Sequence, residues 1–88
     1  MIDKSTQEFF DLVHEHAASD FAFFRSRMGA EWFGDLRRAA LQIPVEKWRE
    51  YALSLIEELQ KAVEWQDARM MTMLFSNAYG NHMRLIWA

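Results

Sequence analysis

The chain has 88 residues, of which 51% are hydrophobic and 26% are charged, and its formal net charge at pH 7 is −3. This composition is too apolar for a disordered chain, and the acidic balance is atypical of proteins that chiefly bind phosphate groups. Because the chain has no cysteine, disulfides, thiol catalysis and thiolate zinc sites are excluded.

The first predicted helix runs from about residue 6 to residue 28. Ser5 and Glu8 have the spacing of a capping box, and Gly29 can adopt the left-handed conformation that ends a helix. On a helical wheel the large apolar residues of this segment cover about half of the circumference. They are Phe9, Phe10, Leu12, Val13, Phe21, Phe23, Phe24 and Met28.

The sequence HEHAASD, which begins at His14, places polar groups in the middle of this helix. His16 and Asp20 lie one turn apart inside the apolar arc, whereas His14 lies about 200° from His16. The two histidines therefore cannot bind one metal ion from a regular helix. We interpret His16 and Asp20 as a structural polar seam in a helical core. A metal-binding or catalytic role is an alternative, and it needs a third ligand such as His82 or Glu57.

The second predicted helix covers about residues 30–42. Its apolar residues fall within about 120° of the wheel and are Trp32, Phe33, Leu36, Ala39, Ala40 and Ile43. Four arginines flank the turn before this helix or lie on it, namely Arg25, Arg27, Arg37 and Arg38. Such a cluster can contact nucleic-acid phosphates, which makes a nucleic-acid-binding regulator an alternative function.

The third predicted helix starts at Pro44, a residue that suits a first helical position, and extends to about residue 76. Its apolar stripe stays in one phase from Val45 to Leu74, and Met70 and Met73 fall within it. An unbroken helix of this length would measure roughly 46 Å, whereas a compact chain of this size is only about 31 Å across. The helix therefore either breaks near the sequence WQDAR or projects from the monomer. A projecting stripe would be covered by a second copy, so we expect a homodimer.

Large residues outside this stripe are the candidate partner-binding residues. Trp65, Met71 and Phe75 are off the stripe, and tryptophan and methionine are enriched in the cores of protein interfaces. Arg37 and Arg38 are the expected charged contacts. After the turn signals in SNAYGN, residues 81–88 form an apolar tail, either a further helical turn or an extended arm.

These patterns predict one all-α domain over residues 1–88, built from three antiparallel helices, or four if the tail is helical, and completed by dimerisation. We expect a cytoplasmic protein-binding module, an adaptor or a stoichiometric inhibitor of the kind that phages and other mobile elements encode. No apolar run approaches the roughly 20 residues of a membrane span, and the acidic start has no signal-peptide pattern. No enzymatic activity, cofactor or metal is predicted, because no phosphate-binding loop, catalytic triad or zinc spacing is present.

Overall fold

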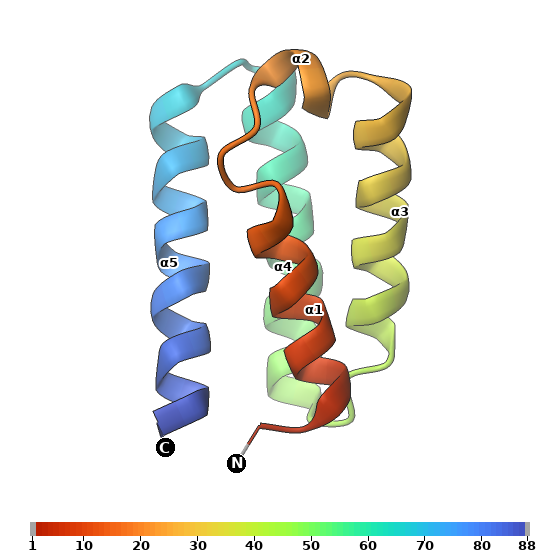
Figure 1. The fold of residues 1–88 in the computed structure, drawn as a ribbon, viewed down its shortest axis with the longest axis vertical. Coiled ribbons are helices and arrows are strands. Elements are labelled where there is room, and N and C mark those ends of the chain that lie inside the picture. Colours follow the sequence, from red (N-terminus) through yellow and green to blue (C-terminus); the bar gives the residue numbers. More distant parts are fainter. Residues whose placement is uncertain (1, 88) are drawn as a thin grey trace.

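The computed structural model describes residues 2–87, which form five helices and no strand (Figure 1). The helices are α1 (Lys4–Glu15), α2 (Phe21–Phe24), α3 (Arg27–Leu41), α4 (Glu46–Glu64) and α5 (Ala68–Trp87). The all-α class is confirmed for this part of the chain. The prediction of three helices, or four with a helical tail, differs from the five observed, because the first predicted helix is interrupted twice and the third once.

The four longer helices run alternately up and down around one core, and the short α2 lies across one end (Figure 1). α1 and α4 each pack against both α3 and α5, so these four helices form a closed ring. The radius of gyration is 12.4 Å, close to the roughly 12 Å expected for a compact chain of this length. The two ends of the described chain lie at the same end of the molecule (Figure 1).

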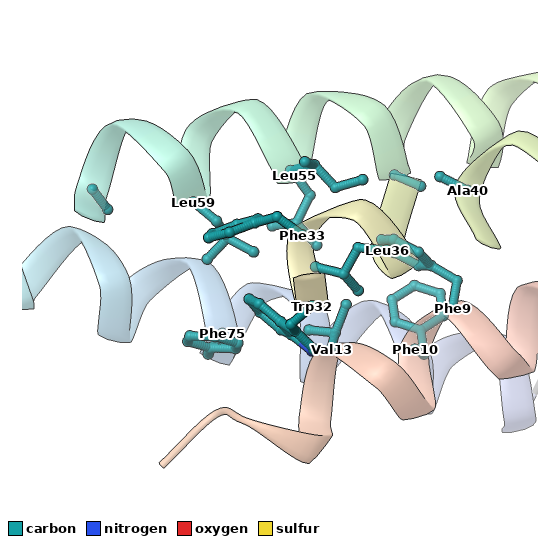
Figure 2. Packing of buried hydrophobic residues seen from close by; sticks show 14 of the residues in the cluster. Phe9, Phe10, Val13, Trp32, Phe33, Leu36, Ala40, Leu55, Leu59 and Phe75 are labelled. Carbon is teal, nitrogen blue, oxygen red and sulfur yellow. The ribbon is translucent and has the colours of Figure 1, made fainter. Parts of the chain in front are cut away.

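The core is rich in aromatic side chains, and Trp32 lies near its centre. In Figure 2, Trp32 of α3 lies close to Val13 of α1 and to Phe75 of α5. The indole Nε1–H donates a hydrogen bond of 2.8 Å to the backbone oxygen of Leu12. Since a buried indole needs such a partner, this bond sets how α3 packs against α1.

α1 begins two residues earlier than predicted, because its cap is an aspartate. Asp3 accepts a hydrogen bond of 2.9 Å from the backbone N–H of Thr6 and one of 2.6 Å from the Thr6 hydroxyl. Ser5 is therefore inside the helix, and the predicted capping box of Ser5 and Glu8 does not form. Glu8 instead lies 4.0 Å from Lys4 in an exposed ion pair.

α1 ends at Glu15, so the predicted helix over residues 6–28 was wrong. Two further capping residues explain the interruption. The Asp20 carboxylate accepts from the backbone N–H of Phe23 at 3.0 Å, and the Ser26 hydroxyl accepts from the N–H of Gly29 at 3.2 Å. Each side chain satisfies an amide that the first turn of a helix leaves free, so α2 and α3 begin there.

Gly29 does not end a helix as predicted but lies in the first turn of α3. A Cβ at this position would lie 2.3 Å from the backbone oxygen of Phe23 and 2.5 Å from that of Phe24. The missing side chain therefore allows the backbones of α2 and α3 to approach closely. Met28, beside it, was expected in the core but is exposed.

The third predicted helix is interrupted at residues 65–67, which separate α4 from α5. Gln66 has a positive φ of 51°, and the backbone N–H groups of Gln66 and Asp67 bond to the oxygens of Val63 and Ala62 at 3.1 and 2.9 Å. This is the hydrogen-bond pattern of a Schellman motif, which ends a helix. The Asp67 carboxylate then accepts from the N–H of Met70 at 3.0 Å and starts α5.

The interruption places α4 and α5 side by side and antiparallel (Figure 1). The predicted stripe is therefore covered largely within the chain, although Met73 is exposed. Gly80, in the expected turn SNAYGN, is inside α5, and the tail continues this helix to Trp87. Residue 88 lies outside the described residues. The over-long helix that predicted a homodimer is absent from residues 2–87.

Candidate functional site

A pair of histidines, the half-buried His14 and the buried His82, joins α1 to α5. The Nε2 atom of His14 lies 3.0 Å from the Nδ1 atom of His82, and the Nε2 atom of His82 lies 3.1 Å from the Gln7 side-chain oxygen. Gln7 in turn donates to Asp11 at 2.7 Å. His82 is only 4% exposed, and its ring stacks on Phe10 with a centroid distance of 4.9 Å.

The hydrogen-bond partners determine the tautomers of this pair. Because the Gln7 oxygen can only accept, Nε2 of His82 carries a proton and Nδ1 of His82 is left as an acceptor. Nε2 of His14 must then donate to it. All the ring nitrogens in these contacts are satisfied when both histidines are neutral.

The surroundings favour these neutral forms. Burial lowers the pKa of His82 below its usual 6.5, and the nearby Asp11 carboxylate partly opposes this effect. Burial also lowers the pKa of His14 below 6.5, and the proximity of His82 lowers it further, again against the effect of Asp11. The pair can take up a proton as the pH falls, but only at a cost to the contact between the helices.

The predicted polar seam of His16 and Asp20 does not form. These residues were expected one helical turn apart, but α1 ends before them. Nδ1 of His16 lies 3.2 Å from the Ser19 hydroxyl, and its ring stacks on Phe23 at 4.1 Å. Asp20 is exposed and caps α2. Within residues 2–87 no group of three or more His, Cys, Asp or Glu side chains could hold a metal ion.

A cavity of about 240 Å³ lies where α1 stops short of the end of α5. α1 spans roughly 18 Å and α5 roughly 30 Å, and the linker and α2 only partly cover the difference. The cavity walls include the apolar side chains of Phe21, Phe24, Met71 and Phe75. Asp20 is at the same cavity, with Ser19 and Thr72 as the other polar lining residues.

Two of the predicted partner-binding residues, Met71 and Phe75, are buried. Met71 and Phe75 are each 7% exposed and belong to the core. They were off the stripe only when the helical phase of α4 was extended through residues 65–67. The turn resets this phase, so Met71 and Phe75 face inward. Trp65, at the end of α4, is 64% exposed, as its predicted role requires.

The predicted charged contacts, Arg37 and Arg38, are both exposed on α3. Arg38 forms an ion pair with Asp35 one turn earlier on the same helix. No ion pair of Arg37 is found among residues 2–87. These two arginines are therefore accessible, but an acidic residue already neutralises part of their charge.

A surface that the sequence interpretation missed lies on the outward side of α5. Five residues lie within about 30° of the line opposite the buried face of this helix, at 100° per residue. We call them the outer strip of α5, and they are Arg69, Met73, Gly80, Arg84 and Trp87. All five are exposed, and Trp87 is 83% exposed. The sequence does indicate this surface, because residues 68–87 lack acidic side chains. The prediction missed it because it extended the helical phase of residues 44–64 through the turn.

Comparison with known protein families, with curated proteins and with solved structures found no match. Among the described helices, none combines the length and the apolar character needed to cross a bilayer.

Proposed function

We propose that this protein is a cytoplasmic protein-binding module, an adaptor or stoichiometric inhibitor that binds its partner through α5 and the turn before it. The observation that carries the proposal is the distribution of exposed apolar side chains. Within residues 2–87, five of the eight large exposed hydrophobic residues lie between residues 65 and 87. They are Trp65, Met73, Tyr79, Ile86 and Trp87.

Single exposed apolar residues are common, but several on one side of a helix in a small chain are typical of an interaction surface. Met73 and Trp87 share the outward side of α5, whereas Tyr79 and Ile86 lie about 120° further around the helix. Tryptophan often supplies a large share of binding energy at such surfaces. Trp65 caps the end of α4, just before α5, and Trp87 is the last residue of α5. The proposal keeps Trp65 from the sequence interpretation and replaces the buried Met71 and Phe75 with the outward residues of α5.

The test begins with affinity capture from the cells that contain the protein, followed by calorimetry with the purified partner. Trp65→Ala and Trp87→Ala should each weaken binding tenfold or more, which corresponds to about 1.4 kcal/mol. Leu41→Ala is the matched control, because Leu41 is an exposed apolar residue on α3. It should bind like the wild type.

The nucleic-acid alternative predicts a different result. If both tryptophan variants bind normally while a double substitution of Arg37 and Arg38 weakens binding with a steep salt dependence, the partner is a nucleic acid. Self-association is measured on the same samples by light scattering. A mass near twice 10.5 kDa that Trp87→Ala abolishes would assign the α5 surface to a homodimer.

A further inference from the structure

We propose that the outer strip of α5 binds one amphipathic α-helix of a partner protein, with an apolar face and an acidic residue near each end. This inference rests on the proposed function and specifies the chemistry of the partner. Three observations carry it: the composition of the strip, an unexplained glycine, and the positions of the two arginines.

The composition of the strip is unusual for a surface helix. On α4, the residues within about 30° of the outermost line are Glu50, Glu57 and Lys61, all charged and exposed. This is the usual polar face of an amphipathic helix. On α5, the corresponding line holds the apolar Met73 and Trp87 and the small Gly80 as well as two arginines, Arg69 and Arg84. An outward face of this kind buries apolar surface only when something else covers it.

Gly80 lies in the middle of this strip, and nothing within the chain explains it. A Cβ added there would meet no atom within 4 Å, and glycine in a helix interior is destabilising relative to alanine. Ser76, one turn earlier, is also small and exposed. Small side chains reduce the distance at which two helices can pack, so the backbone of a second helix can approach α5 here.

The charges on the strip define the partner further. All 13 acidic residues of the chain precede Ala68, and Arg69 and Arg84 are the arginines of α5. Both are exposed, and no ion pair joins either of them to another residue between 2 and 87. They are about 22 Å apart along the axis, so a helix lying alongside would need acids about 15 residues apart.

The same charges disfavour a second copy of α5 as the occupant. In an antiparallel pair of α5 helices centred on the strip, Arg69 of one copy would approach Arg84 of the other. In a parallel pair each arginine would approach its own equivalent. Like charges facing each other across an interface weaken binding, whereas acids at these positions would strengthen it.

The test uses a displayed library of amphipathic helical peptides in which the flanking positions carry Glu, Lys or Gln with equal frequency. Selection on the full chain should enrich peptides with Glu about 15 residues apart. Their affinity, measured by calorimetry, should fall fivefold or more with Gly80→Ala and further with Gly80→Leu. Charge reversal of Arg69 and Arg84 to Glu should shift the preference to Lys-flanked peptides.

Gly34→Ala is the matched control, because Gly34 is inside α3 and its added Cβ would meet only Arg38 Nη1 at 3.8 Å. It should leave peptide binding unchanged. The proposal is overturned if no helical peptide is enriched, or if the enriched peptides bind Gly80→Leu as well as the wild type. It is also overturned if the wild type dimerises through the strip, or if it binds vesicles containing anionic lipid and not the peptides.

These outcomes separate this inference from the proposed function. If the captured partner loses affinity for Trp87→Ala but is indifferent to Gly80→Leu and to the arginine reversal, the protein-binding function stands and the helical mode falls. If the captured partner is indifferent to every α5 substitution, both fall together.

Discussion

Nε2 of His14 in α1 and Nδ1 of His82 in α5 are 3.0 Å apart, although the two residues are 68 positions apart in the chain. Both pKa values lie below the usual 6.5, chiefly because burial disfavours the protonated rings, and His82 lowers the pKa of His14 further. The unfolded chain therefore binds more protons than the folded chain as the pH falls through 6.5. The stabilising contribution of the pair is fully present above pH 6.5 and is lost below it.

We expect the free energy of unfolding to fall as the pH is lowered from 7 to 5.5. Each histidine that takes up a proton only on unfolding contributes at most about 1.4 kcal/mol per pH unit. The change is measured by urea denaturation at each pH. His14→Gln can still donate to His82 but cannot titrate, so its slope should be smaller than that of the wild type. An equal slope would show that other groups cause the pH dependence.

Asp20→Ala should lower the free energy of unfolding by about 1 kcal/mol, because α2 loses its cap. Asp20→Asn should stay within a few tenths of a kcal/mol of the wild type, since asparagine is an equally good capping residue. Thermal denaturation compares the two variants. If Asp20→Asn is as damaging as Asp20→Ala, the negative charge of Asp20 at the start of α2 contributes more than its cap hydrogen bond.

Gly29→Ala should destabilise the fold by about 2–3 kcal/mol, because the new methyl group would collide with the backbone oxygens of Phe23 and Phe24. Gly34→Ala, also in α3, should instead stabilise it by up to about 1 kcal/mol. Chemical denaturation of both variants checks this opposite sign. Two stabilised variants would mean that α2 moves away from α3 at little cost.

Gln66→Gly should stabilise the fold by roughly 0.5–1 kcal/mol, because the positive φ of 51° at Gln66 favours glycine. Gln60→Gly is the control, since Gln60 is exposed inside α4 and glycine there should cost about 1 kcal/mol. Denaturation midpoints report both changes. A destabilised Gln66→Gly would indicate that the Gln66 side chain contributes to the turn.

The inward face of α3 was predictable from sequence, because its apolar residues repeat with helical spacing over an uninterrupted segment. Of the residues placed on this face, Trp32, Phe33, Leu36 and Ala40 are buried in α3, Ile43 is buried just after it, and Ala39 is half-buried. In an uninterrupted helix, the spacing of the apolar residues shows directly which side of the helix packs against the core.

The interruptions were harder to predict, because apolar residues recur on both sides of them with nearly the same phase. The breaks at residues 16–20 and 25–26 end at Asp20 and Ser26, whose capping role depends on backbone conformation. The break at residues 65–67 uses Gln66 where a glycine would have been the usual signal. Sequence reasoning allowed a break there but did not decide it.

The candidate sites depended on these interruptions. His14 and His82 meet only because α4 and α5 fold back on each other, so no local pattern predicts the pair. The inward positions of Met71 and Phe75, and the outward position of Met73, follow from the phase of α5 after the turn. A helical wheel drawn separately for residues 68–87 would have found the outer strip.

The ring of helices has one consequence for folding. The neighbouring pairs α1–α3, α3–α4 and α4–α5 follow one another along the chain, interrupted only by the short α2, whereas α1–α5 joins its two ends. The last pair carries the largest loop-closure entropy, so we expect it to form late and to open first in native-state hydrogen exchange. In a circular permutant that links the two ends and opens the chain at residues 65–67, α4 and α5 would be the pair furthest apart in sequence. The α4–α5 contact should then form last. Which helix pair opens first therefore depends on how the chain connects the helices. The permutant should change which amides exchange first while the packing of the core stays the same.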